Sequence, residues 1–191
     1  MATSPMNKSL SFSRFLVPVA ILALFIIIGL TVIKMTLNRK PSDHSTVVLE
    51  SGTVLPDVTF TRLDGKSVQL SELKGKVFLI NFWATWCDAC MEEMDSLVKL
   101  RETYKNKGFE ILGVNLDENP VAVASKVSKQ YEIHFPIFKD PEGKLAEVFD
   151  VRAIPLSVLI DKHRKVLLVK DGEQDWYSSE FRSELENWLK P

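Results

Sequence analysis

The sequence predicts an α/β fold with a central mixed sheet flanked by helices, and two observations carry that prediction. Two apolar runs of strand length, residues 77–83 and 109–115, are separated by a segment with helical periodicity, which is typical of a parallel strand–helix–strand crossover. Further along, residues 156–161 and 165–170 flank a tight polar turn and precede an amphipathic segment, as expected for an antiparallel hairpin closed by a helix. Parallel strands followed by antiparallel strands make a mixed sheet.

A short hairpin is predicted ahead of this sheet. Residues 58–62 and 67–70 are strand-like and flank Asp64-Gly65, a dipeptide that favours tight hairpin turns. Residues 77–83 then have the nearly continuous apolar sequence VFLINFW. Such a run predicts a strand that is covered on both faces.

The helices are predicted from their apolar periodicity and from their ends. Apolar side chains recur on one face of residues 88–107, and Gly108 ends that helix. A second helix begins at Asn119-Pro120, an N-cap followed by proline at the first helical position. A short strand is expected at residues 137–138 and a short helix at 144–149. The closing helix has an apolar face formed by Phe181, Leu185, Trp188 and Leu189.

Composition excludes several classes of function. The chain has 191 residues and a net charge of −1, so it offers no basic surface for a nucleic acid. Its two cysteines are too few for an all-cysteine zinc site, and His44, His134 and His163 are scattered singly. A phosphate-binding glycine loop, a serine-centred triad motif and an HExxH zinc motif are all absent from the sequence.

The N-terminal part differs in composition from the rest. Residues 1–40 contain five basic residues and no acid, and residues 15–33 are apolar and uncharged. At about 1.5 Å per residue this segment is close to 30 Å long, the thickness of the hydrocarbon core of a bilayer. It therefore predicts a transmembrane anchor rather than a buried core helix. A cleaved signal peptide is the sharper alternative, but the exit sequence Thr31-Val32-Ile33 is a poor cleavage site.

The predicted organisation follows from this anchor. Residues 1–14 form a short cytoplasmic N-terminus, 15–33 the anchor, 34–54 a polar linker and 55–191 the α/β domain. Basic residues stand on both sides of residues 15–33, so the positive-inside rule does not choose an orientation. The side of the membrane that holds the domain has to be inferred from the chemistry of the domain.

Both cysteines lie in one motif, Trp86-Cys87-Asp88-Ala89-Cys90, between a predicted strand and a predicted helix. The i, i+3 spacing brings the two side chains to one helical face, where a small adjustment allows a disulfide. A helix start stabilises a thiolate, so Cys87 is the predicted attacking thiol and Cys90 the more covered, resolving thiol. Two inert core cysteines are the alternative, but this spacing at a strand–helix junction favours redox chemistry.

The sequence resembles a known family at this point. The stretches FLINFWATWCDAC, EILGVNLDE, HFPIFKD and AIPLSVLID are similar to the membrane-anchored thioredoxin-like proteins of the TlpA/ResA/DsbE type, over residues 55–191. The resemblance implies a thioredoxin-like fold with the added N-terminal hairpin, on the outer side of a bacterial cytoplasmic membrane, facing the periplasm or the cell exterior. It implies a thiol-disulfide reductase whose only redox group is the Cys87–Cys90 pair.

The resemblance also assigns roles to further residues. Pro155 matches the cis-proline of the family, and Ile154 before it would pair with an extended substrate strand. Leu156 stands where the family usually has threonine. Glu93 matches a glutamate of ResA-like members and is expected to relay a proton to and from Cys90, with a raised pKa caused by partial burial. Asn81 occupies the strand position at which thioredoxin has an acid.

The residues around Cys87 are expected to tune the reaction. The carboxylate of Asp88, about 6 Å away, disfavours a Cys87 thiolate by about 0.7–2.8 kcal/mol. Since this destabilises the reduced form, the expected potential is nearer that of thioredoxin, about −270 mV, than that of DsbA, about −120 mV. Trp86 is expected to shield the disulfide and to offer an apolar surface to a partner, whereas Trp83 is expected to lie in the core.

Expected partners are proteins with disulfides or vicinal thiols, namely apocytochrome c or a copper-site protein, and a membrane thiol that donates electrons. A peroxiredoxin is excluded because Ala84 stands where the peroxidatic cysteine needs a threonine. A copper-binding protein of the Sco kind stays as an alternative, although it would have three residues between its cysteines where this chain has two. A disulfide oxidase or isomerase with the same fold is the other alternative.

Overall fold

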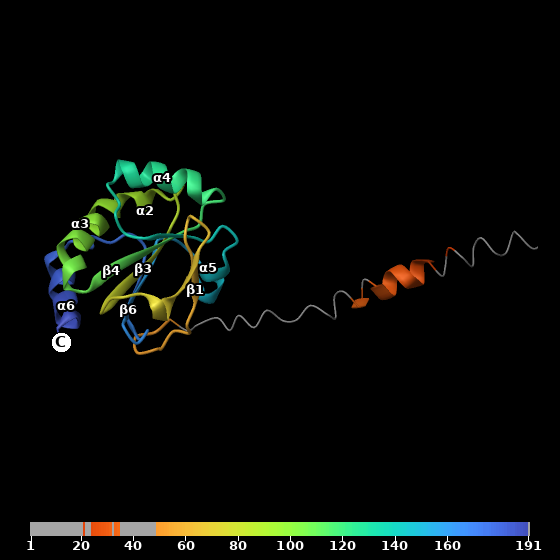
Figure 1. The fold of residues 1–191 in the computed structure, drawn as a ribbon, viewed down its shortest axis with the longest axis horizontal. Helices are drawn as coiled ribbons and strands as arrows, with labels where there is room; N and C mark the ends of the chain where they lie inside the picture. The colour runs from red at the N-terminus through yellow and green to blue at the C-terminus, as the bar shows by residue number, and fades with distance from the viewer. Residues whose placement is uncertain (1–20, 22–23, 32, 35–48, 191) are drawn as a thin grey trace, which may run out of the picture. The chain divides into compact units, whose positions relative to one another are not determined.

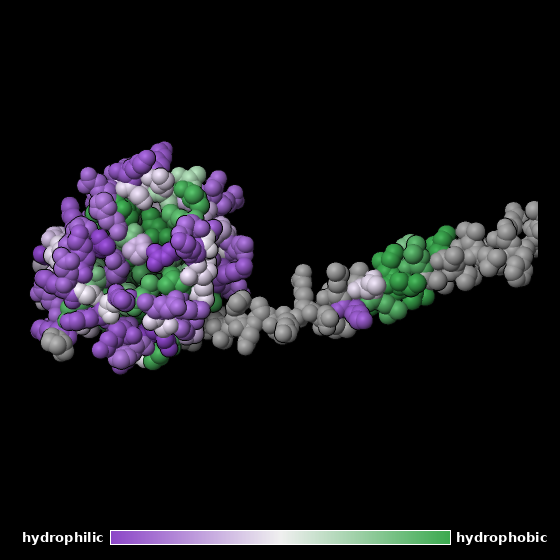
Figure 2. Space-filling view, in the orientation of Figure 1, coloured by the Kyte–Doolittle hydropathy of each residue, from purple (hydrophilic) through white to green (hydrophobic). Residues whose placement is uncertain are grey.

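The structure, a computed structural model, describes residues 21, 24–31, 33–34 and 49–190. The chain divides into two units, Met1–Asp43 and His44–Pro191, and each is described by itself. In the first unit the described residues are helical, and those on the face seen in Figure 2 are mostly hydrophobic. Among the described residues, no helix is both long enough and apolar enough to cross a membrane. The predicted N-terminus at 1–14, much of the anchor predicted at 15–33 and most of the linker predicted at 34–54 lie outside them.

The described part of the second unit forms two sheets. A small antiparallel sheet pairs β1 with β2, and a five-stranded sheet has the order β5-β4-β3-β6-β7. In the larger sheet β3, β4 and β5 pair in parallel, β6 pairs antiparallel with β3, and β7 pairs antiparallel with β6. The strands are β1 (Thr59–Thr61), β2 (Ser67–Gln69), β3 (Val77–Trp83), β4 (Phe109–Asn115), β5 (Ile137–Lys139), β6 (Leu156–Asp161) and β7 (Val166–Asp171). The predicted mixed sheet and the added hairpin are confirmed.

Helices connect and cover the strands, and the expected short ones are present. They are α2 (Asp88–Glu92), α3 (Met94–Tyr104), α4 (Pro120–Gln130), α5 (Lys144–Val148) and α6 (Ser179–Leu189), with 3₁₀ turns η1 (Leu70–Glu72) and η2 (Lys105–Lys107). Gly108 directly follows η2, the 3₁₀ turn at the end of α3. Its φ of +100° lies in the left-handed region, so it ends this helical segment, as its position predicts. Gly65 has φ +86° in the predicted hairpin turn.

Two hydrophobic cores fill the two faces of the large sheet. Alternate residues of β3 point to opposite faces, so Leu79 packs with α3 and α6 while Ile80 packs with the β1–β2 hairpin and α5. Figure 1 shows α3 and α6 on one side of the sheet, and α5 and β1 on the other. All seven residues of β3 are buried, which confirms the prediction that this strand is covered on both faces.

The helix predicted at residues 88–107 is interrupted. It ends at Glu92, Glu93 forms a turn, and a new helix begins at Met94. The hydroxyl of Ser96 donates a 2.7 Å hydrogen bond to the backbone carbonyl of Glu93, which also accepts from the backbone N–H of Leu97 at 3.1 Å. The sequence pattern did not predict the interruption because the apolar face continues across it.

The domain begins earlier than the predicted boundary at residue 55. The backbone N–H of Gly52 donates to Val166, the N–H of Val166 donates to Thr53, and Val54 bridges to Lys165. Residues 50–54, assigned to the linker from their polarity, are therefore held by main-chain bonds that composition does not reveal. The chain joins the domain at the turn between β6 and β7, beside the first residue of β3, since Val77 pairs with Asp161.

Candidate active site

Cys87 and Cys90 form a disulfide bond at the end of the sheet where β3 finishes. Their Cα atoms are 5.3 Å apart, and Cys87 is the N-cap of α2 while Cys90 lies within it. The backbone N–H of Cys90 points at the sulfur of Cys87, 3.2 Å away. Cys87 is 8% exposed and Cys90 0%, so partners reach Cys87 first. This is the order of exposure that the sequence predicts.

The loop that leads from β3 to Cys87 is held by a buried acid. Asp117, which follows β4, accepts hydrogen bonds from the backbone N–H of Thr85 at 3.0 Å and from its hydroxyl at 2.8 Å. The amide of Asn115 donates to the same carboxylate at 2.7 Å. Next in the loop, Trp86 is 67% exposed. The loop is therefore fixed at Thr85 and presents a large aromatic side chain to solvent beside the disulfide.

The segment just before β6 supplies the other side of the site. The peptide bond between Ile154 and Pro155 is cis, as the resemblance implies. The carbonyl oxygen of Ile154 lies 3.6 Å from the sulfur of Cys87. Trp86, Ile154 and Pro155 are thus brought to the same end of the sheet as the disulfide.

Glu93 is a buried carboxylate one turn beyond Cys90, and it is only 2% exposed. Its oxygen atoms accept three hydrogen bonds: from the Asn81 amide at 2.8 Å, the Trp176 indole at 3.0 Å and the Gln174 backbone at 3.2 Å. Burial raises the pKa of Glu93 above its ordinary value, although the three donors oppose that shift. Glu93 therefore ionises at a higher pH than an ordinary glutamate.

Asp88 and Trp83 lie in contrasting surroundings. Asp88, the first residue of α2, is exposed to solvent next to Cys87. Trp83 is fully buried beneath the site, as expected. A Cβ atom on Gly113 of β4 would lie 3.2 Å from the indole nitrogen of Trp83 and 3.0 Å from the ring of Phe135. Glycine at this position therefore allows the tryptophan to pack closely against the sheet.

Sequence reasoning did not single out Trp176, Gln174, Ser96 or Ser157 as part of this site. Ser157 lies beside Asn81 in the β3–β6 register, and the Asn81 amide donates to its hydroxyl at 2.9 Å. Trp176 and Gln174 come from the loop between β7 and α6, far from the cysteines in sequence. The one available signal is Trp176 itself, a tryptophan in an otherwise polar loop.

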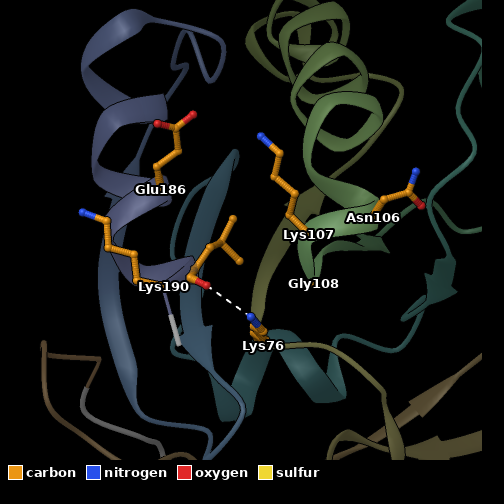
Figure 3. Close-up of a pocket in the computed structure, with 7 residues that line it drawn as sticks. Lys76, Asn106, Lys107, Gly108, Glu186 and Lys190 are labelled. Atoms are coloured by element: carbon orange, nitrogen blue, oxygen red, sulfur yellow. Dashed lines mark hydrogen bonds between the residues drawn. The ribbon is translucent and has the colours of Figure 1, made fainter.

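A cleft of about 600 Å³ lies elsewhere in the domain (Figure 3). Its lining includes Lys76 and Gly108, which precede β3 and β4, and Glu186 and Lys190 of the α6 region. The ammonium of Lys76 donates to the carbonyl of Leu189 across it. Because Cys87 follows the opposite end of β3, the length of that strand, about 23 Å, separates the cleft from the disulfide. The cleft is not part of the candidate site.

Comparison with known proteins gives a consistent result. Residues 50–187 match the model of the Redoxin family. The thiol-disulfide oxidoreductase ResA of Bacillus thuringiensis subsp. konkukian is 39% identical over 142 residues, which cover 74% of this chain and 78% of the relative. ResA of Bacillus subtilis is 31% identical over 152 residues, 80% of this chain and 81% of the relative.

A solved structure is similar as well. A crystal structure from Chlorobium tepidum, described as a thiol:disulfide interchange protein DsbE, matches with a TM-score of 0.67 and 31% identity. The match covers 75% of this chain and 100% of that one. The fold predicted from the resemblance, a thioredoxin-like sheet flanked by helices, is confirmed.

Proposed function

Because this chain belongs to the Redoxin family and is a thiol-disulfide oxidoreductase of the TlpA/ResA/DsbE-like group, we propose that it reduces protein disulfides on the outer side of a bacterial cytoplasmic membrane. The observation that carries the proposal is the Cys87–Cys90 disulfide at one end of the sheet. Cys87 is the more exposed partner and stands beside the exposed Trp86. A sulfur with slight exposure, backed by one that is fully buried, suits a two-step exchange.

The reaction begins from the reduced form of the pair. The Cys87 thiolate attacks one sulfur of a substrate disulfide, a mixed disulfide forms, and the other substrate sulfur leaves as a thiolate and takes up a proton. Cys90 then loses its proton and attacks the sulfur of Cys87, which releases the second substrate thiol. Two electrons pass from the cysteine pair to the substrate, and Cys87 and Cys90 end as a disulfide. A thiol donor returns both electrons.

Glu93 is the proposed proton acceptor for Cys90 in the second step. It follows Cys90 by three residues, and its burial raises its pKa, which brings the carboxylate closer to the pKa of a thiol and makes the transfer less uphill. In the return reaction the protonated Glu93 gives the proton back to the departing Cys90 sulfur.

The proposed substrate contacts are Trp86, Ile154 and Pro155. Trp86 offers an exposed aromatic surface, and the backbone of Ile154 lies next to the attacking sulfur of Cys87. An extended peptide that pairs with this backbone would place its disulfide at Cys87. Asp88 is exposed beside Cys87, and the reducing potential inferred from the sequence stays a prediction.

The client and the location rest on the sequence. Residues 15–33 are the proposed anchor, and the proposed clients are the haem-binding cysteines of apocytochrome c or a copper-site protein. A membrane thiol protein is the proposed electron donor. The resemblance to the TlpA/ResA/DsbE type supports all three assignments.

Replacing Cys90 by serine provides the test. The variant lacks the resolving thiol, so Cys87 is expected to stay joined to its client as a mixed disulfide that accumulates in membranes. The adduct is identified by mass spectrometry after capture of the full chain, with Cys87→Ser/Cys90→Ser as the matched control. Recovery of a periplasmic or surface protein through its cysteine supports the proposal. Equal recovery with the double variant contradicts it.

Glu93→Gln is expected to slow the resolving step by about a hundredfold at neutral pH. Reduced full-length protein in detergent micelles is mixed with one equivalent of dithionitrobenzoate. The first thionitrobenzoate reports attack by Cys87, and the second reports resolution by Cys90. In the wild type the second rate should rise with pH as Glu93 ionises, above the ordinary glutamate range because burial raises its pKa. The variant should lack this rise of the second rate with pH.

Glu92→Gln is the control for this substitution because Glu92 is the neighbouring, exposed acid of α2. It should leave the second rate and its pH profile unchanged. An unaltered profile in Glu93→Gln would remove Glu93 from the mechanism.

A further inference from the structure

The loop between β7 and α6 is fastened to the interruption between α2 and α3. The backbone N–H of Trp176 donates to the hydroxyl oxygen of Ser96 at 3.1 Å. The same hydroxyl lies 3.4 Å from the carbonyl oxygen of Gln174 and donates to the carbonyl of Glu93. The loop therefore sits in a fixed position over the turn at Glu93.

The side chain of Trp176 is fixed as well. It is 2% exposed, and its ring packs edge-on against Phe181 of α6, with centroids 4.9 Å apart and planes at 82°. The indole N–H is the one polar group of this side chain, and a buried indole usually finds an acceptor. Here the acceptor is Oε2 of Glu93 at 3.0 Å, in a fully buried contact.

Three hydrogen-bond donors contact the carboxylate of Glu93. The indole of Trp176 and the backbone of Gln174 reach Oε2, and the amide of Asn81 reaches Oε1. Donors to both oxygens favour a carboxylate over a carboxylic acid. Burial acts in the opposite direction, as does the negative charge of Glu173 in the same loop. The hydrogen bond from Trp176 opposes the effect of burial on the pKa of Glu93.

We propose that Trp176 is a positioning residue of the exchange reaction: its indole N–H orients the Glu93 carboxylate and keeps it ionised so that it can accept the proton of Cys90. The inference rests on the proposed role of Glu93. It assigns the C-terminal loop, remote from the cysteines in sequence, a part in the resolving step. Removal of the N–H alone takes away one hydrogen bond that opposes the effect of burial on the pKa of Glu93, so Glu93 ionises at higher pH.

The test uses the same two-phase assay on reduced full-length protein in micelles. Trp176→Phe retains an aromatic ring and removes the donor. The second thionitrobenzoate release is expected to slow about tenfold at neutral pH, the worth of one hydrogen bond to a charged group. The rise of this second rate with pH should move to higher pH, while the rate of the first release is unchanged. Trp188→Phe is the matched control, because Trp188 packs against the same core without a bond to Glu93.

Two further variants separate positioning from packing. Benzothienylalanine placed at position 176 keeps the shape of the indole and replaces N–H by sulfur, so it should reproduce the pH shift even if Trp176→Phe unfolds. In the Glu93→Gln background, Trp176→Phe should add no further change, because coupled residues are not additive. The inference would be overturned if benzothienylalanine left the pH dependence of the second release unshifted. It would also be overturned if the effects of Trp176→Phe and Glu93→Gln were fully additive.

The test of Trp176 can be distinguished from the test of the proposed function. The dithionitrobenzoate assay requires no client, so it reports on Trp176 even if Cys90→Ser captures no periplasmic or surface protein. If Glu93→Gln changes the profile and neither Trp176 variant does, only the inference about Trp176 fails.

Discussion

Replacing Cys87 by serine is expected to lower the rate of disulfide reduction by about a thousandfold or more, because a serine hydroxyl is not ionised near neutral pH and forms no disulfide. Cys87 is the more exposed sulfur of the pair and lies 3.6 Å from the carbonyl of Ile154. Cys90 is fully buried and is not placed to replace it. The measurement is the reduction of insulin disulfides by reduced full-length protein in micelles.

Cys90→Ser separates the two thiols in the same assay. It should also lose turnover, yet it should release one thionitrobenzoate from dithionitrobenzoate, whereas Cys87→Ser should release none rapidly. Rapid release by Cys87→Ser would mean that Cys90 is reachable, and the assigned order of attack would then be reversed.

Phe60→Ala is expected to lower the free energy of unfolding by about 3–5 kcal/mol, the usual cost of emptying a buried aromatic site. Phe60 belongs to the added hairpin, is fully buried, and its ring centroid lies 4.9 Å from that of Phe138 in β5. The hairpin therefore contributes side chains to the core between the sheet and α5, rather than lying on the surface of that core. Urea unfolding of the full chain in micelles, followed by tryptophan fluorescence, gives the change from the midpoint and slope.

Val68→Ala in the other strand of the hairpin is the control. Val68 is only half-buried, so its truncation should cost about 1 kcal/mol or less. Equal losses in the two variants would show that the hairpin is uniformly weak and that Phe60 does not anchor it.

Local patterns predicted much of this fold. Residues 77–83 and 109–115 match β3 and β4 because a buried parallel strand needs apolar residues on both faces. The Asp64-Gly65 turn was predictable because its left-handed glycine is a local requirement. The cysteine spacing likewise fixed the candidate disulfide, and the order of exposure followed from the position of each cysteine at the start of the helix.

Long-range polar contacts were beyond such patterns. Glu93 accepts bonds from Ser96, Asn81 and Trp176, which come from different elements. A helical wheel contains no information about a loop more than eighty residues away. The start of the domain was predicted too late for the same reason, because Gly52 and Thr53 are held through backbone groups that every residue carries.

The place where the domain begins also bears on how clients approach. Residues 52–55 are bonded to the β6–β7 turn, about one strand length from Cys87. The polypeptide at the start of the domain thus leaves Trp86 and the neighbouring sulfur unobstructed.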